Sequence, residues 1–356
     1  MNDLLTSQPL VIVTGAGASK WLDKATTYDI YDAPEFKNRQ QLSLLSEFRN
    51  HVVRQTNQEA VDLEYLLDYL KDLNAKFDEV AAVREYAGHM NNLKEQRKQF
   101  GEVFESTLDF MVDYYGNVDE DRALALYEPL FDGVRDVLAG VGSRREVISI
   151  FTLNYDEAVE SAVDRMPRYE LRDGFGAGHR RYWDARNFDE ISPNPGHLSV
   201  ALFKLHGSVS WTRRAGVVGR IEKTPDVPRR REGRDHVVLY PTKEPKPIDE
   251  EPFSTAYGYL AAALAKSRVG VFIGTSFRDA ELLDTIRRTF KKSSRFSVLA
   301  VGPECKTKAV AQKLEVPQAR VVGVPLTFEP DTIPKILNRI DDQLEKAPPR
   351  RMRQKQ

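Results

Sequence analysis

The sequence predicts an α/β protein with a doubly wound, mostly parallel sheet of about six strands. Three observations predict this fold: a short apolar run that ends in a glycine turn, further strand-like runs in the second half, and helical periodicity between them. The chain has 356 residues, of which 41% are hydrophobic and 29% charged, as in a globular protein with a large buried core. We expect one domain over residues 1–346.

The first predicted strand is Leu10–Thr14, a β-branched and aliphatic run that stops at the glycine-rich residues 15–19. Such a run is typical of a buried strand that enters a tight turn. Glycine lets the backbone approach a phosphate without a Cβ clash, and the following amides can donate to phosphate oxygens. The pattern is that of a Rossmann-like nucleotide-binding unit, although Gly-x-Gly by itself fits an ordinary tight turn equally well.

A helical insertion subdomain is expected over about residues 38–140, where apolar residues such as Leu63, Leu66 and Leu70 recur three and four positions apart. Strand-like runs return after this insertion. They cover residues 147–152, 200–205, 236–240, 269–273, 297–301 and 320–324.

Two segments are not expected to belong to the core. Residues 212–235 are polar and contain Arg229-Arg230-Arg231, which predicts a variable loop or hairpin. Residues 347–356 are basic and contain proline, which predicts a disordered tail. Because short solvated arginine clusters usually need no partner, we expect direct nucleic-acid binding to be weak or absent.

Charge and cysteine content exclude several classes of protein. The formal net charge of −1 gives no general attraction to nucleic acid or membrane. Cys305 is the only cysteine, which excludes an internal disulfide framework and a metal site of several thiolates, so no metal is expected. No run is long and apolar enough to cross a bilayer, and Met1–Pro9 has no signal-peptide pattern. We expect a cytoplasmic, unprocessed protein.

Polar residues follow three further predicted strands, where α/β enzymes place ligand groups. Thr152, Asn154 and Asp156 end the second strand, but Asn and Asp are also ordinary helix caps. His206 ends the third strand and is a candidate general base, although a lone histidine is more often structural. Gly274, Thr275, Ser276 and Asp279 end a later strand, where a capped strand-to-helix turn would use the same residues.

Read in order, these four segments resemble the sirtuin superfamily. Its Gly-Ala-Gly NAD loop matches Gly15-Ala16-Gly17-Ala18-Ser19, and its Thr-Gln-Asn-x-Asp motif matches residues 152–156 with Leu153 in place of glutamine. Its catalytic His-Gly matches His206-Gly207, and its Gly-Thr-Ser turn matches residues 274–276.

The departures from sirtuin deacylases narrow this resemblance. The Gly-Ile-Pro-Asp-Phe-Arg stretch after the glycine loop is missing, and one cysteine is too few for the four-cysteine zinc module, so no zinc is expected. Three features are similar to those of bacterial sirtuin-like proteins of antiviral defence: Leu153 in place of glutamine, the Ser276–Asp279 ending and the long helical insertion. The resemblance to that group implies that this protein is an NAD glycohydrolase that depletes NAD on infection. It also implies that the protein forms a homo-oligomer and has a separate regulatory partner, such as a HerA-like ATPase or an Argonaute-type protein.

The resemblance implies specific roles within one NAD site. Asn154 and His206 would be catalytic, Asn154 positioning the ribose and a water and His206 acting as general base. Gly15, Ala16, Gly17 and Ser19 would hold the diphosphate. The other expected NAD-binding residues are Thr152, Asp156, Gly274, Thr275, Ser276 and Asp279. Two alternatives remain: an NAD-dependent protein deacylase or ADP-ribosyltransferase, and a non-catalytic NAD or ADP-ribose-binding scaffold.

Overall fold

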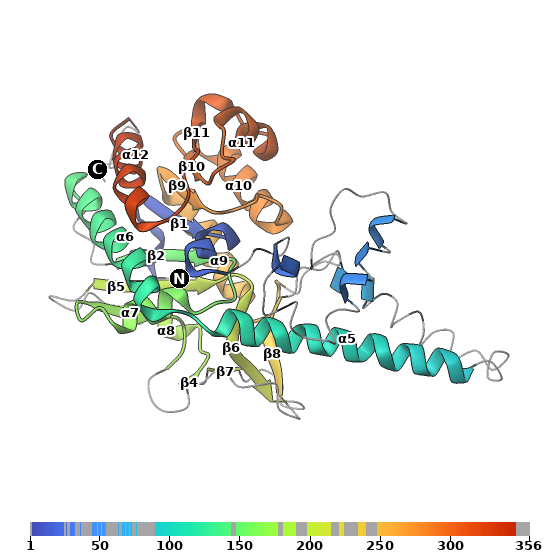
Figure 1. Cartoon of the computed structure of the whole chain (residues 1–356). Coiled ribbons are helices and arrows are strands. Elements are labelled where there is room, and N and C mark those ends of the chain that lie inside the picture. The colour runs from blue at the N-terminus through green and yellow to red at the C-terminus, as the bar shows by residue number, and fades with distance from the viewer. Residues whose placement is uncertain are drawn as a thin grey trace.

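Seven strands form one fully parallel sheet, in the order β11-β10-β9-β1-β2-β5-β3 (Figure 1). The computed structural model describes residues 2–24, 26, 29–32, 36, 45–47, 49–50, 52–54, 63, 66–67, 69–70, 72, 76, 90–143, 147–176, 181–189, 198–214, 221–223, 234–239 and 248–346. The strands are β1 (Leu10–Thr14), β2 (Val147–Thr152), β3 (Tyr169–Arg172), β5 (Leu198–Lys204), β9 (Val269–Ile273), β10 (Ser297–Val301) and β11 (Val321–Val324).

The order of the strands reverses at β1. On one side of β1 lie β2, β5 and β3, which the chain forms first, and on the other side lie β9, β10 and β11. Open α/β sheets bind ligands outside the carboxyl ends of the strands at such a reversal. A ligand site is therefore expected among the residues that follow β1, β2, β5 and β9.

The predicted fold class is confirmed, and the strands expected at β1, β2, β9 and β10 have the predicted bounds. The short strand β3 was not predicted, because its residues are mostly half-buried and give no continuous apolar run.

The run predicted at residues 236–240 does not belong to the parallel sheet. Its residues 236–238 lie in β8 (Arg234–Val238) of a four-stranded antiparallel sheet, in the order β4-β7-β6-β8. The partners of β8 in this sheet are β4 (Arg181–Tyr182), β6 (Gly207–Arg214) and β7 (Ile221–Lys223). An apolar run shows that a strand is buried, but it does not show which sheet the strand joins. In the predicted loop 212–235, β6 and β7 pair as antiparallel neighbours, while residues 215–220 and 224–233 lie outside the described residues.

Helices cover both faces of the parallel sheet, which explains why its strands are apolar on both sides. Along β1, Leu10 and Ile12 pack with α6, α7 and α12, whereas Val11 and Val13 pack with α9, α10 and α11. The helices are α1 (Asp3–Thr6), α5 (Met90–Gly116), α6 (Glu120–Gly140), α7 (Ala158–Asp164), α8 (Arg186–Asp189), α9 (Phe253–Lys266), α10 (Ala280–Lys292), α11 (Thr307–Leu314) and α12 (Ile333–Lys346). Short 3-10 helices are η1 (Ala16–Leu22), η2 (Ile30–Asp32), η4 (Gln318–Arg320) and η5 (Pro330–Thr332).

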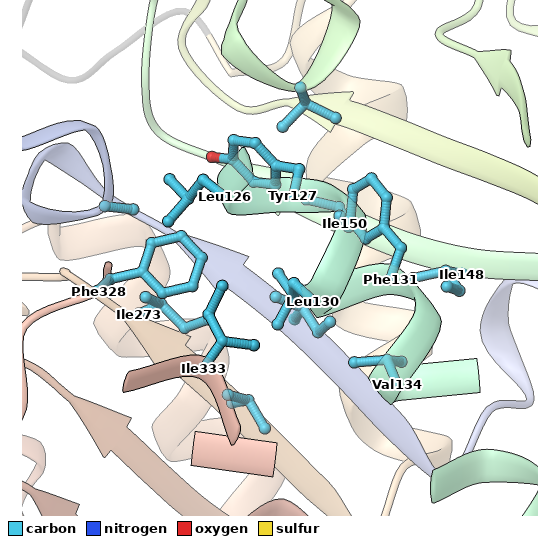
Figure 2. Packing of buried hydrophobic residues seen from close by; sticks show 14 of the residues in the cluster. Leu126, Tyr127, Leu130, Phe131, Val134, Ile148, Ile150, Ile273, Phe328 and Ile333 are labelled. Atoms are coloured by element: carbon cyan, nitrogen blue, oxygen red, sulfur yellow. The ribbon is translucent and has the colours of Figure 1, made fainter. Parts of the chain in front are cut away.

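Helix α6 lies within the predicted insertion, yet it packs directly on the sheet. Figure 2 shows Leu130 and Phe131 of α6 beside Ile148 and Ile150 of β2, in one buried cluster that also holds Ile333. Helix α5 is different, because it extends away from the sheet (Figure 1). The described residues of the predicted insertion therefore include both a helix that covers the sheet and a helix that projects from it.

A third apolar cluster connects the projecting helix to the carboxyl edge of the sheet. Phe110, Met111 and Tyr115 of α5 belong to it, together with Tyr155, which follows β2. The rings of Tyr115 and Tyr155 are 6.0 Å apart in an edge contact. None of the helices in the described ranges is both long and apolar enough to span a bilayer. The predicted tail, residues 347–356, lies outside the described residues.

Candidate functional site

The four sequence motifs meet at one edge of the sheet. Their strands β9, β1, β2 and β5 are direct parallel neighbours, so their carboxyl ends lie side by side. Backbone hydrogen bonds continue this order beyond the strands. They run from Gly15 N to Ile273 O at 2.9 Å, from Leu153 N to Thr14 O at 3.0 Å, and from Leu205 N to Thr152 O at 2.8 Å.

The glycine turn after β1 packs against the glycine turn after β9. Gly17 N donates to Gly274 O at 2.9 Å, and Gly274 has a φ of +65°. A Cβ on Gly17 would lie 2.8 Å from Gly274 Cα, and one on Gly15 would lie 2.9 Å from Gly274 O. These glycines therefore allow two turns to touch, in addition to any approach by a ligand. The amides of Gly15, Gly17 and Ala18 donate within the protein, so the turn offers fewer amides to a diphosphate than its sequence suggests.

Ser19 joins the first motif to the second through its side chain. Asn154 Nδ2 donates to Ser19 Oγ at 2.8 Å, and Ser19 Oγ donates to Asp156 Oδ2 at 2.7 Å. All three residues are less than one tenth exposed. Asp156 also accepts from Ala158 N with its other oxygen, as a residue beside a helix start does. Asp156 therefore acts both as a helix cap, through Oδ1, and as a partner of Ser19 at the site, through Oδ2.

Three buried oxygen atoms at this edge have no hydrogen-bond partner among the described residues. They are Thr14 Oγ1, Asn154 Oδ1 and Thr275 Oγ1, from the ends of β1, β2 and β9. An unsatisfied buried polar atom costs about 1–3 kcal/mol, and most such atoms in folded proteins have a protein or water partner. Three such oxygens at the ends of adjacent strands could accept hydrogen bonds from the hydroxyl or amide groups of a polar ligand.

His206 lies at the end of β5 and is 6% exposed. The glycine behind it is required by the turn, because Gly207 has a φ of +81° and a Cβ there would lie 2.0 Å from Val237 O. The backbone of His206 is held by Leu239 N, which donates to His206 O at 2.8 Å. Its ring lies 6.3 Å from that of Tyr155 and contacts Asp279 through Nε2.

A buried ion cluster lies beneath the loop that carries Asn154. Lys204, one of its members, donates to the backbone oxygen of Asp156 and to Glu160 Oε1 at 3.0 Å. Lys223 contacts Asp173 at 2.9 Å and Glu160 at 3.5 Å. The remaining members are Glu157 and Arg181. Because it ties β5, α7 and β7 together, the cluster fixes the position of the second motif relative to His206.

The cluster has a defined charge state. Burial by itself would raise the pKa of Glu160, but Lys204 and Lys223 outweigh burial and hold that pKa below its usual value. Asp173 behaves in the same way, with Lys223 and then Arg181 as the cations that lower its pKa. Burial lowers the pKa of Lys223, but Asp173 and Glu160 outweigh it and raise the pKa. All three groups are therefore charged at neutral pH.

Replacing Lys223 with methionine is expected to lower the free energy of unfolding by about 3 kcal/mol at pH 7, since the buried carboxylates of Asp173 and Glu160 each lose one of their two cations. Carboxylates with lowered pKa values stabilise the fold above their unfolded pKa of about 4 and lose this contribution as the pH falls. In the variant the pKa values of Glu160 and Asp173 rise, so the difference in free energy of unfolding between variant and wild type should shrink towards pH 3. Urea denaturation at pH 7 and pH 3 measures this difference.

The matched control for Lys223→Met is Lys98→Met on α5. Lys98 forms an exposed pair with Glu102 at 3.8 Å, and its side chain is 77% exposed. Exposed pairs contribute about 0–1 kcal/mol, so this variant should unfold almost as the wild type does. Equal effects of the two substitutions would show that the buried cluster does not stabilise the fold.

The predicted site residues lie at the carboxyl edge of the parallel sheet, but they differ in the hydrogen bonds that they make there. Asn154 and Thr275 carry oxygens without a partner among the described residues, and Asn154 and Asp156 bond to Ser19. Thr14, which was not predicted as a site residue, carries a third such oxygen. Ser276 lies in the turn after β9 but is exposed, and no hydrogen bond joins it to the other predicted site residues in the described part of the chain. Thr152 Oγ1 accepts from Asn154 N at 3.1 Å, so it orders the loop from within.

Lys204 and Tyr257 lie at this site and were not predicted. Lys204 is the last residue of β5 and the one charged residue of the predicted run 200–205, and that charge was a usable signal, because a charge in a buried strand needs a partner. Tyr257 lies on α9 in an apolar helix stripe and donates to Asp279 Oδ1 at 3.4 Å. Nothing in its local sequence distinguishes it from a core tyrosine. Across the described ranges, no group of three or more potential ligands is arranged to hold a metal ion.

Comparison with known proteins supports the sirtuin-superfamily prediction. Residues 148–316, which carry the second, third and fourth motifs, match the family model described as a SIR2-like domain. No curated protein matches the chain.

Solved Sir2 structures align over nearly the whole chain. A mutant Sir2 homologue in complex with ADP-ribose is 12% identical, with 97% of this chain and 95% of that chain covered and a TM-score of 0.41. A Sir2 homologue in complex with NAD is 13% identical, with 97% and 92% covered and a TM-score of 0.41. A complex of Sir2 with a p53 peptide and NAD+ is 13% identical, with 97% of each chain covered and a TM-score of 0.37.

Proposed function

We propose that this protein is a SIR2-like enzyme that binds NAD at the carboxyl ends of β1, β2, β5 and β9 and hydrolyses its nicotinamide–ribose bond. The observation that carries this proposal is the group of buried oxygens of Thr14, Asn154 and Thr275, which have no hydrogen-bond partner among the described residues. They come from the adjacent strands β1, β2 and β9, and β2 pairs with β5, the strand that precedes His206. The match of residues 148–316 to a SIR2-like domain supports NAD as the ligand.

The residues present fit a dinucleotide in distinct parts of the site. Asn154 Oδ1 needs a donor, and a ribose hydroxyl or a water molecule supplies one. Thr14 and Thr275 hydroxyls can bond to phosphate or ribose oxygens on either side of the two glycine turns. Ser19 would hold the diphosphate end of the loop, and it already fixes Asn154 and Asp156. Gly274 and Ser276 would line the adenosine ribose.

Hydrolysis breaks the bond between ribose C1′ and the nicotinamide nitrogen, and the bond electrons leave with nicotinamide. Positive charge develops on the ribose, so the protein must orient the sugar and admit one water molecule. Asn154 orients the ribose and this water, and His206 accepts the proton that the water loses as its oxygen bonds to C1′. The products are nicotinamide, ADP-ribose and one proton. Asp156 holds the nicotinamide amide or orders the loop that carries Asn154.

Product analysis tests the proposal. The purified chain is mixed with NAD, alone and with the protein encoded by its neighbouring gene, and nicotinamide and ADP-ribose are quantified by chromatography. We expect the two products in equal amounts without any acyl-lysine peptide. NAD consumption that requires such a peptide would instead assign the deacylase or transferase alternative. Tight NAD binding without turnover in every mixture would assign the scaffold alternative.

The biological role that we propose is NAD depletion in bacterial antiphage defence, under the control of a separate partner. It rests on the similarity of the Ser276–Asp279 ending and the long insertion to that group of proteins. A toxic activity of this kind must be restrained until infection. A homo-oligomer regulated by a HerA-like ATPase or an Argonaute-type protein would provide such restraint, and the mixture with the neighbouring protein tests it.

A further inference from the structure

We infer that Asp279 is a positioning residue for His206: it fixes the orientation and tautomer of the imidazole ring and stabilises its protonated form. This inference rests on the proposed function. Its basis is a direct contact of 3.0 Å between His206 Nε2 and Asp279 Oδ2. The two side chains are 8% and 6% exposed, so the pair is shielded from water and interacts strongly.

The carboxylate is itself rigidly held from two sides. Asp279 Oδ1 accepts from Leu282 N at 2.8 Å and thereby caps α10. The same oxygen accepts from the Tyr257 hydroxyl of α9 at 3.4 Å. Burial, followed by the charge of Asp279, raises the pKa of Tyr257, so this hydroxyl keeps its proton and remains a donor. Oδ2 is therefore aimed at His206 by contacts that do not involve the histidine.

The helix cap does not require this second contact. Serine, threonine and asparagine cap helices as well as aspartate does. The backbone of His206 is also fixed without Asp279, by the bond from Leu239 N and by the turn at Gly207. Of the contacts of Asp279 described above, only the one from Oδ2 acts on the imidazole ring.

The contact determines where a proton can go. An ionised carboxylate only accepts hydrogen bonds, so the ring hydrogen lies on Nε2. A ring with its hydrogen on Nε2 takes up a further proton at Nδ1. The water that attacks ribose C1′ would pass its proton to Nδ1, and the resulting imidazolium would be paired with the Asp279 carboxylate. Serine hydrolases use the same order of carboxylate, imidazole and reacting oxygen, with the roles of the two ring nitrogens exchanged.

Two substitutions separate the cap from the contact with the ring. Asp279→Ser keeps a capping oxygen but has no second oxygen for Nε2. Asp279→Asn keeps the size of the side chain. With its oxygen on Leu282 N, however, its amide group would donate to Nε2 and force the ring hydrogen onto Nδ1. For both variants we expect kcat for NAD cleavage to fall about 10²–10⁴-fold with KM changed less than about threefold.

The control is Asp119→Ser. Asp119 caps α6 through Oδ1, which accepts from Arg122 N at 3.0 Å, so this substitution tests a cap change of the same kind away from His206. It should leave kcat and KM at wild-type values. Thermal melting of all variants verifies that the fold is retained.

A second readout needs no activity. Nitrogen-15 NMR of the unliganded protein, with the His206 signals assigned by comparison with His206→Gln, reports which ring nitrogen carries hydrogen. We expect it on Nε2 in the wild type and on Nδ1 in Asp279→Asn. The same tautomer in both proteins would overturn the inference whether or not the chain cleaves NAD, as would wild-type kcat in both Asp279 variants. A wild type that never cleaves NAD would instead overturn the proposed function.

Discussion

Replacing His206 with alanine is expected to lower the rate of NAD cleavage about 10²–10⁴-fold, because it removes the group that accepts the proton of the attacking water. Asn154→Ala is expected to cost about 100-fold or more, because it removes the amide that orients ribose and water. Asn154 Nδ2 donates to Ser19, so the side chain is held before any ligand binds, and its Oδ1 has no partner among the described residues. Initial rates of nicotinamide release measure both effects.

Asn187→Ala is the matched control for Asn154→Ala. Asn187 Nδ2 makes a comparable bond to Gly174 O at 2.9 Å, but it lies on α8. We expect wild-type turnover from it. If Asn154→Ala and His206→Ala both turn over NAD as fast as the wild type does, the roles assigned to these two residues are wrong. Melting temperatures close to that of the wild type would show that any loss of activity comes from the missing side chain and not from unfolding.

Replacing Gly274 with alanine is expected to disrupt the contact between the two glycine turns. A non-glycine residue in the left-handed region costs about 1–3 kcal/mol. The added Cβ would also lie 2.2 Å from Ala18 N and 2.4 Å from Gly17 C, both of which are backbone atoms. The turn after β1 must then move, which displaces Ser19 and with it the bond to Asn154. We expect a lower free energy of unfolding in urea and loss of NAD binding by calorimetry.

Gly101→Ala provides the corresponding control. Gly101 lies inside α5, and an added Cβ would meet no atom within 4 Å. Alanine is favoured over glycine inside a helix by about 0.5–1 kcal/mol, so this variant should be as stable as the wild type or slightly more stable. An unchanged stability of Gly274→Ala would mean that the two turns do not need their close contact.

The sequence predicted the local elements of the site well. The apolar runs at Leu10–Thr14, Val147–Thr152 and Val269–Ile273 became the strands β1, β2 and β9, because burial on both faces requires continuous apolar residues. Glycine after β1 and β9 marked tight turns. The physical reason for these glycines was incompletely predicted, since Gly15, Gly17 and Gly274 also serve contact between the turns themselves.

The contacts that give the site its geometry could not be predicted in this way. Asp279 was expected in a cofactor-binding turn, and its contact with His206, which lies 73 positions earlier, was not expected. Ser19 lies 135 positions from Asn154. The cluster around Lys204 and Lys223 also combines residues from several distant elements. Patterns among neighbouring residues do not show which residues far apart in the sequence come into contact.

The sequence by itself determined which residues form strands, where the glycine turns fall and which polar side chains follow the strands, because burial periodicity and turn preference are properties of neighbouring residues. Only the tertiary structure decided that β1 stands between β2 and β9, that His206 faces Asp279, and that Lys223 and Lys204 share the buried carboxylate of Glu160. The order of strands in a sheet and the packing of helices on it bring these groups together, and both depend on the whole chain.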